Sequence, residues 1–146
     1  MLYPNDRMKL TNSALASEQF QSHYHCRLPL RWMSPESIVN VRKFLQISKS
    51  FFSLAVQNQF TIQSDIWSFG ITLWEIMNHC RMLPYHFLND EQVHRRLSLA
   101  EDLHLSKPDG AEKEVIDLML ECWRPNDQRP TFKDIAMFFN KCLDVV

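Results

Sequence analysis

The sequence predicts a mainly α fold, a bundle of helices with no convincing strand. Apolar residues recur at intervals of three and four over 64–78, over 111–124 and again after Pro130. No segment shows the sustained alternation of a half-buried strand. With 45% hydrophobic and 12% aromatic residues among 146, the chain has the size and the apolar content to bury the core of one domain.

The first 27 residues are predicted to form an irregular segment. They mix Asn, Ser, Thr, Gln and His with scattered apolar residues and show no sustained period. The central helix is predicted from Ser64 to Asn78, and its apolar positions are numerous enough for a buried helix. These positions are Ile66, Trp67, Phe69, Gly70, Ile71, Leu73, Trp74 and Met77.

A second helix is predicted to begin near Asn89, whose side chain can cap it while that of Gln92 reaches back to the cap. Val93 and Leu97 then share one face of this helix. The third helix is predicted over 111–124, before Pro125, with a stripe of Ile116, Met119, Leu120 and Trp123. Of the tryptophans, Trp67, Trp74 and Trp123 are assigned to the core.

The last helix is predicted to begin at Pro130 and Thr131. Asp134 stands three residues after Thr131, which is the spacing of a capping pair. The apolar stripe predicted for this helix consists of Phe132, Ile135, Ala136, Phe139 and Leu143.

Composition excludes several classes of function. The net charge of -1 disfavours binding to nucleic acid or anionic lipid. The four cysteines, at 26, 80, 122 and 142, include no CxxC pair and suggest a reducing compartment. The first ten residues are too polar for a signal peptide, and no apolar run reaches the roughly 18 residues of a membrane span, so we expect no membrane segment in this chain.

Three stretches carry a resemblance to a known family. They are LPLRWMSPESI at 28–38, FTIQSDIWSFGITLWEI at 60–76 and CWRPNDQRPTF at 122–132. In this order they resemble the large lobe of the protein tyrosine kinase catalytic domain. With LPYHFLNDEQV at 83–93, the chain is similar to the discoidin domain receptor branch of receptor tyrosine kinases. The resemblance implies the helical, C-terminal part of the large lobe over 28–146, an activation-loop-like segment over 1–27, and no small β-rich lobe.

The resemblance implies structural roles for three charged residues. Glu36, in the Ser-Pro-Glu that stands for Ala-Pro-Glu, would form a buried bidentate pair with Arg129. The alternative is a weak surface ion pair. Asp65 matches the aspartate that binds the catalytic-loop backbone in kinases; the alternative is that it only favours a helix N-terminus by its charge.

Residues 28–33 resemble the loop that supports the phosphoacceptor tyrosine. Pro29 would offer a flat apolar face to the substrate ring. The substrate-binding residues implied in this way are Leu28, Pro29, Arg31, Trp32 and Met33. An equally open interpretation of Trp32 is core packing, since large aromatic side chains are buried on average.

No catalytic, cofactor-binding or metal-binding residue is expected in this chain. Kinases need a glycine-rich loop, a lysine-glutamate pair, a catalytic-loop aspartate with its asparagine and an Asp-Phe-Gly aspartate. We find none of these motifs, and Gly70 and Gly110 are the only glycines. ATP and Mg²⁺ are therefore implied for the complete parent kinase only.

Residues 41–57 form an insertion that the family lacks at this place. Their removal leaves ESIVNNQFTIQSD, which has the family's usual length. One hypothesis is a retained intron read in frame, and the alternative is a genuine surface insertion. Two weaker hypotheses concern the first segment: phosphorylation at Tyr24, and a metal bound by His23, His25 and Cys26, for which a flexible polar loop is the favoured interpretation.

The favoured function is that of a piece of a receptor-type tyrosine kinase that would be inactive alone. Its parent would transfer phosphate from ATP to tyrosine in protein substrates and hold this part on the cytosolic side of the plasma membrane. The alternative is a non-catalytic, kinase-like interaction module that binds kinase partners or the missing small lobe. A third possibility is that the chain has no cellular role.

Overall fold

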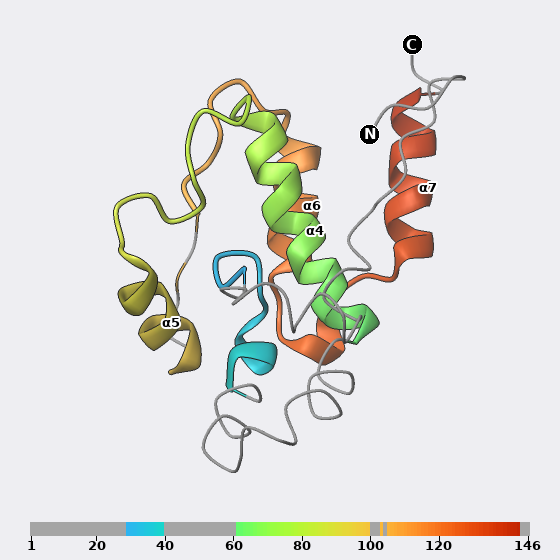
Figure 1. Cartoon of the computed structure of the whole chain (residues 1–146). Helices are drawn as coiled ribbons and strands as arrows, with labels where there is room; N and C mark the ends of the chain where they lie inside the picture. Colours follow the sequence, from blue (N-terminus) through green and yellow to red (C-terminus); the bar gives the residue numbers. More distant parts are fainter. Residues whose placement is uncertain (1–28, 40–60, 100–102, 104, 144–146) are drawn as a thin grey trace, which may run out of the picture.

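The computed structural model describes residues 29–39, 61–99, 103 and 105–143, and these are predominantly helical. The elements in chain order are a helical turn over 35–39, α4 (Ile62–Met77), α5 (Asp90–Ser98), α6 (Lys113–Cys122), the 3-10 turn η3 (Asn126–Gln128) and α7 (Phe132–Leu143). Figure 1 shows α4 at the centre, with α5 at one side and α7 at the other. No strand occurs in the described ranges, which confirms the predicted mainly α fold.

Helix α4 is the buried centre of the bundle. Its predicted apolar face is confirmed, with Ile66, Ile71 and Trp74 almost completely inaccessible to solvent and Phe69 and Met77 half-buried. The helix begins two residues before the predicted Ser64, because Thr61 and Ser64 cap each other. The Ser64 amide donates to Thr61 Oγ1 at 3.1 Å, and the Thr61 amide donates to Ser64 Oγ at 2.9 Å.

Helix α5 begins as predicted. Asn89 accepts a hydrogen bond from the Gln92 amide at 2.9 Å, and the Gln92 side chain accepts one from the Asn89 amide at 3.0 Å. Val93 and Leu97 are buried on one face, while the other face is exposed. The reciprocal cap satisfies two amides that the helix itself cannot satisfy, which fixes where the helix starts.

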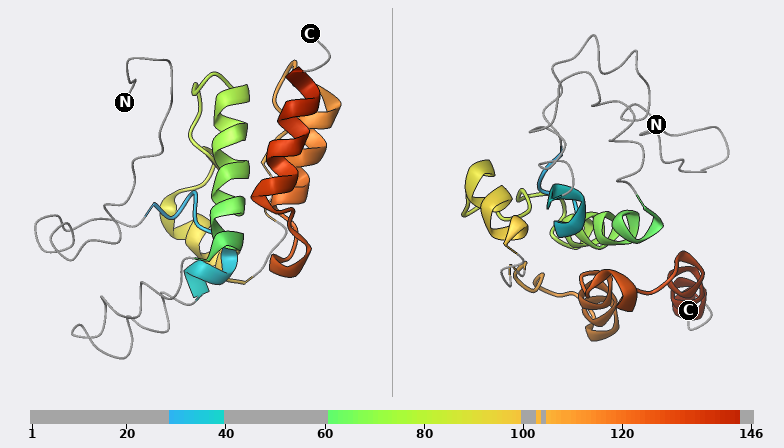
Figure 2. Two further views of the ribbon diagram at one scale, coloured as in Figure 1. Left: turned by 90° about the vertical axis from the view of Figure 1, so that its right-hand side faces the viewer. Right: turned by 90° about the horizontal axis from the view of Figure 1, so that it is seen from below.

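Helix α6 packs along α4 at close range, as Figure 2 shows. It is two residues shorter at each end than the predicted 111–124. Met119 is buried as predicted, whereas Leu120 is 45% exposed. Trp123, which was predicted for the core, is half-buried and packs against it. The buried positions that the stripe omitted are Leu118 and Cys122, and burial raises the pKa of the Cys122 thiol to about 12.

Helix α7 is less buried than its periodicity predicted. Of the predicted stripe only Ile135 is buried; Phe139 is half-buried, Ala136 is exposed, Phe132 is 42% exposed and Leu143 is 73% exposed. The reason is that α7 lies at the edge of the bundle, as Figure 2 shows. It contacts α4 through edge-to-face pairs of aromatic rings. The ring centroid of Phe69 is 6.3 Å from that of Phe132 and 6.4 Å from that of Phe139.

The predicted cap of α7 is confirmed. The Thr131 amide donates to Asp134 Oδ2 at 2.9 Å, and the Asp134 amide donates to Thr131 Oγ1 at 3.2 Å. These hydrogen bonds from Thr131 lower the pKa of the Asp134 carboxyl.

Two consecutive residues with left-handed backbone follow the C-terminal end of helix α4. His79 has φ 54° and Cys80 has φ 53°. The His79 amide donates to the Ile76 carbonyl at 2.9 Å and the Cys80 amide to the Glu75 carbonyl at 2.8 Å, which is the pattern of a Schellman motif. Glycine is the residue favoured at the position of His79, so the bulkier side chain carries a conformational cost.

We expect His79→Gly to stabilise the chain by about 0.5–1 kcal/mol, because glycine adopts the left-handed conformation without strain but costs some entropy in the unfolded chain. Urea unfolding followed by circular dichroism measures the change. Arg81→Gly is the control, since the backbone of Arg81 is not left-handed. That variant is expected to be neutral or less stable, and equal stabilisation of both would contradict the explanation.

Gly70→Ala tests the close approach of α4 and α6. A Cβ at this position would lie 2.7 Å from Trp123 Nε1 and 2.8 Å from Cys122 Cβ. We expect a loss of about 1–3 kcal/mol in the free energy of unfolding, because this overpacking outweighs the higher helix propensity of alanine. Thr72→Ala, on the exposed side of α4, should be neutral or slightly stabilising; a neutral Gly70→Ala would show that the helices can move apart freely.

Candidate functional site

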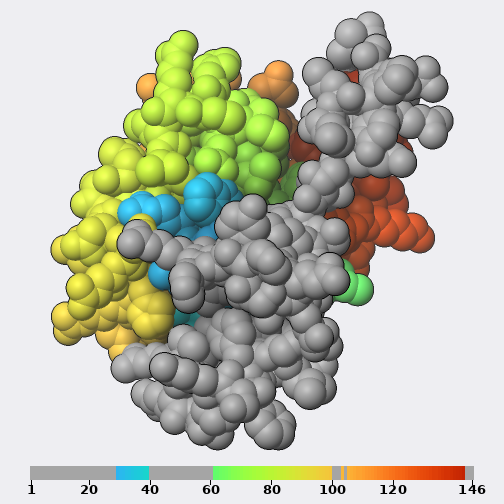
Figure 3. All heavy atoms as spheres, in the orientation of Figure 1, coloured from blue at the N-terminus to red at the C-terminus, as the bar shows by residue number. Residues whose placement is uncertain are grey.

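The candidate site is the segment 29–33 and the short helical turn that follows it. A tight turn brings the Trp32 amide to 3.0 Å from the Pro29 carbonyl, and the Met33 amide to 3.3 Å from that of Leu30. Met33 is buried in the core, while Pro29 and Leu30 are half-buried. Figure 3 shows this segment, in blue, reaching the surface beside the yellow atoms of α5 and the chain before it. The predicted Leu28 lies outside the described residues.

Arg31 fastens this segment to the loop before α5. Its Nη1 donates to the carbonyls of Pro84 at 2.7 Å and Tyr85 at 3.0 Å, and its Nη2 donates to that of Leu88 at 2.8 Å. Its Nε donates to Asp90 Oδ1 at 2.8 Å, in the first turn of α5. These are internal contacts of the chain, so Arg31 positions the segment, a role that the sequence comparison with kinases did not suggest.

The loop that Arg31 binds is itself unusual. Tyr85 has a left-handed backbone, with φ 54°, and its side chain is 1% exposed. Burial raises the pKa of its hydroxyl well above the usual range for tyrosine. No sequence pattern signals three carbonyls converging on one arginine, because the turn that directs them is specific to this loop.

Trp32 is anchored to the central helix. Its Nε1 donates to Glu75 Oε2 at 2.6 Å, and its carbonyl accepts from Ser68 Oγ at 2.8 Å. The ring is half-buried against the core. Trp32 thus combines features of both interpretations, since one side of it packs on the bundle and the remainder stays accessible.

Glu36 and Arg129 form the predicted bidentate ion pair. Arg129 Nη1 lies 2.6 Å from Glu36 Oε1, and Nη2 lies 3.0 Å from Oε2. The Arg129 side chain is 2% exposed and that of Glu36 is 29% exposed, which excludes the alternative of a surface pair. Burial of the Glu36 carboxyl favours its neutral form, but the hydrogen bonds from Arg129, the Glu36 backbone and Ser34, together with the charge of Arg129, outweigh this and hold its pKa below the ordinary value.

Arg129 also joins two further segments. Its Nη1 donates to the Gln63 carbonyl at 2.9 Å, and its Nε donates to the Arg124 carbonyl at 2.8 Å. The guanidinium lies over the Trp67 ring, 5.1 Å from the centroid, in a cation-π contact. Glu36, the start of α4 and the turn after α6 are therefore tied to one buried charge.

Asp65 lies in the first turn of α4 and is exposed. No residue of the described ranges donates a hydrogen bond to its carboxylate, and partial desolvation raises its pKa. A negative charge at this position suits the helix N-terminus. The kinase-type role, binding to a catalytic-loop backbone, stays a prediction.

The described part of the chain offers no metal site, since no three His, Cys, Asp or Glu side chains come together there. The hypotheses on Tyr24, on His23, His25 and Cys26, and on the insertion 41–57 all fall outside the described residues. Among the described helices, none combines the length and the apolar character that a membrane crossing requires.

Comparison with known proteins gives a consistent result. The model of the protein tyrosine and serine/threonine kinase family matches residues 1–139. Epithelial discoidin domain-containing receptor 1 of Homo sapiens is 30% identical over 135 residues, which is 88% of this chain and 13% of the relative. Inactive tyrosine-protein kinase 7 of Mus musculus is 32% identical over 89% of this chain and 11% of the relative.

A viral relative agrees. The tyrosine-protein kinase transforming protein Abl of Abelson murine leukemia virus is 30% identical over 86% of this chain and 14% of the relative. The chain thus spans between 11% and 14% of the length of these curated relatives.

Glu36→Ala is expected to lower the free energy of unfolding by about 3 kcal/mol, because it leaves the buried Arg129 charge without its partner. The matched control is Asp90→Ala. It removes the carboxylate that pairs with Arg31, and this carboxylate is 61% exposed. That variant should lose no more than about 1 kcal/mol. Urea unfolding of both variants measures the difference, and equal losses would contradict the role assigned to burial.

The stabilisation from Glu36 should also depend on pH. Because the folded-state pKa lies below the ordinary 4.5, the contribution is complete above that value and is lost as the pH falls through the folded-state pKa. We expect the stability difference between the natural chain and Glu36→Gln to shrink steadily below about pH 4.5. A difference independent of pH between 3 and 7 would show that the carboxylate charge is unimportant.

Proposed function

The chain belongs to the protein tyrosine and serine/threonine kinase family, and from this premise we propose that it is the peptide-binding part of a receptor-type tyrosine kinase. The complete protein would transfer phosphate from ATP to tyrosine in protein substrates. The observation that carries the proposal is the anchoring of residues 29–33 to both α4 and the loop before α5. The family match also confirms the resemblance carried by the motifs.

The anchoring favours peptide binding because it pre-organises the backbone. Arg31 and Trp32 are held by side chains and carbonyls of the bundle, so the turn between Pro29 and Met33 needs no ordering when a ligand arrives. Pro29 and Leu30, both half-buried, are left to offer apolar surface to a substrate. Arg31 and Met33 would support this surface, and the resemblance implies that Leu28, which lies outside the described residues, also contributes to it.

We further propose that the chain alone does not catalyse phosphoryl transfer. Its sequence contains no Asp-Phe-Gly and no His-Arg-Asp, and its two glycines, Gly70 and Gly110, are 40 positions apart. Among the described residues, no three or more His, Cys, Asp or Glu side chains come together in a group that could hold a metal ion. These residues do not fit ATP and Mg²⁺, which other parts of the parent protein would have to bind.

A specific observation favours a second candidate, a non-catalytic interaction module. One relative bears the name inactive tyrosine-protein kinase 7, so the family includes a protein named as inactive. In that case the segment 29–33 and α5 would bind a protein partner without a reaction. In both cases, on the analogy of the receptor relatives, we place this part on the cytosolic side of a plasma membrane receptor.

Peptide binding can be tested directly with the purified chain. A fluorescein-labelled acidic peptide with one tyrosine, followed by fluorescence polarisation, is expected to bind, and Trp32→Ala should weaken it about tenfold through loss of an anchored aromatic side chain. The same peptide with serine in place of tyrosine should bind more weakly. Arg124→Ala is the control variant, because Arg124 lies outside the segment 29–33 and its hydrogen bond to Arg129 is made by its backbone carbonyl.

The remaining outcomes separate the two candidates. Addition of Mg²⁺ and ATP should neither raise the unfolding temperature nor phosphorylate the peptide. Phosphorylation would refute the proposed inactivity, and equal affinity for the tyrosine and serine peptides would favour the interaction module. Absence of any binding, with the fold intact by circular dichroism, would refute both.

A further inference from the structure

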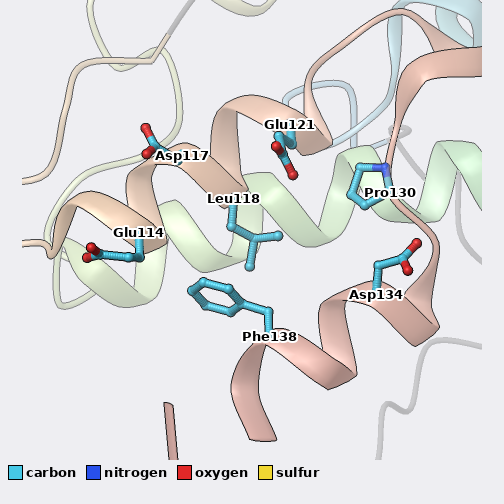
Figure 4. A pocket seen from close by; sticks show the side chains of 7 residues that line it. All are labelled: Glu114, Asp117, Leu118, Glu121, Pro130, Asp134 and Phe138. Atoms are coloured by element: carbon cyan, nitrogen blue, oxygen red, sulfur yellow. The ribbon is translucent and has the colours of Figure 1, made fainter. Parts of the chain in front are cut away.

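A groove of about 270 Å³ lies between α6 and α7, away from the segment 29–33. Figure 4 shows Leu118 and Phe138 facing each other at its middle. Glu121 and Asp134 stand at one end, near Pro130, and Glu114 stands at the other. The groove is therefore apolar at its centre and acidic at both ends.

The acidic ends are poorly compensated within the described residues. Asp117 has only Lys113, at 3.8 Å on the same exposed helix face, and neither Glu114 nor Glu121 has an ion-pair partner there. Asp134 uses its Oδ2 to cap α7, and the hydrogen bonds from Thr131 keep it ionised. An occupant of this groove must be basic at both ends and apolar between them.

The outer face of α7 has this pattern. Lys133, Met137 and Lys141 are exposed, with Met137 47% exposed, and they follow one another at intervals of four residues on one helix face. The two lysines are about 12 Å apart along the helix axis, and Glu114 and Glu121 are about 10 Å apart along α6. Lys133, Met137 and Lys141 thus form a ridge on α7. This ridge matches the groove in length and is opposite to it in charge.

We propose that α7 of a second copy of this chain docks in the groove, so that two chains form an isologous dimer. Helices α6 and α7 run antiparallel (Figure 2), so a partner α7 antiparallel to this α7 runs parallel to α6. The partner subunit's Lys133 then meets Glu114, and the partner subunit's Lys141 meets Glu121 and Asp134. The partner subunit's Met137 covers Leu118 and Phe138.

The two-fold arrangement fills both grooves at once. Each copy presents its ridge to the groove of the other, as a self-complementary interface requires. Two α7 helices would lie at the centre, flanked by the two α6 helices. Because so few side chains are involved, the interface is smaller than that of a permanent dimer, and we expect a weak association that salt weakens further. This inference does not depend on the proposed function.

Sedimentation velocity of the full chain tests the dimer. Between about 10 and 500 μM protein at low salt, the mass is expected to rise from that of the 17.4 kDa monomer toward twice that value. Lys141→Glu and Glu121→Lys should each raise the dissociation constant about tenfold by placing like charges together. The double variant Glu121→Lys with Lys141→Glu should recover part of the association lost in each single variant, because it re-forms the Glu121 pair with the charges exchanged while Asp134 stays in the groove.

Two controls keep the test specific. Lys107→Glu changes the net charge as Lys141→Glu does, but lies outside the groove and the ridge, and should leave the dimer unchanged. Met137→Leu should preserve association, and Met137→Glu should abolish it, with circular dichroism confirming an intact fold in both variants.

The proposal is overturned by a monomer at the highest concentration, by an effect of Lys107→Glu equal to that of Lys141→Glu, or by failure of the charge exchange to recover any of the lost association. Loss of association in Phe87→Glu but not in Met137→Glu would place the contact at the exposed loop before α5 and overturn it as well.

Discussion

The buried guanidinium of Arg129 is the constraint on which the rest of the structure depends. A charge withdrawn from water must be compensated within the protein, and Arg129 finds its partners in Glu36, in the carbonyls of Gln63 and Arg124 and in the Trp67 ring. These groups come from separate stretches of the chain. Displacement of any one of these groups would leave the buried Arg129 charge incompletely compensated. The segments that carry them are therefore held in one arrangement.

The segment 29–39 takes its position from this constraint and from a second arginine. Toward the end of the segment, Glu36 is paired with Arg129. Toward its start, Arg31 fixes the segment to the loop before α5. Trp32 adds a connection to α4 between them. A candidate peptide-binding surface is thereby formed from a short irregular segment, whose own hydrogen bonds would be insufficient to define its shape.

The sequence predicted the helices well because their signals are local. Capping pairs such as Asn89 with Gln92, and the period of α4, depend on neighbours within a few residues. The stripe of α7 was wrong since periodicity reports which residues share a face, whereas the depth of burial depends on how many other elements cover that face. The Glu36 pair was predicted through family resemblance, but the role of Arg31 depends on carbonyls more than fifty residues away and on the local turn at Tyr85, which no sequence pattern encodes.

The closed environment of Tyr85 also bears on how the chain can be modified. Tyr85 is one of three tyrosines, with Tyr3 and Tyr24, and its side chain is buried as part of the core. An enzyme that attaches a group to a tyrosine oxygen must first take that oxygen into its own active site, which the folded chain does not allow here. A covalent modification found on Tyr85 would therefore have been added before the chain folded or during local unfolding of this loop.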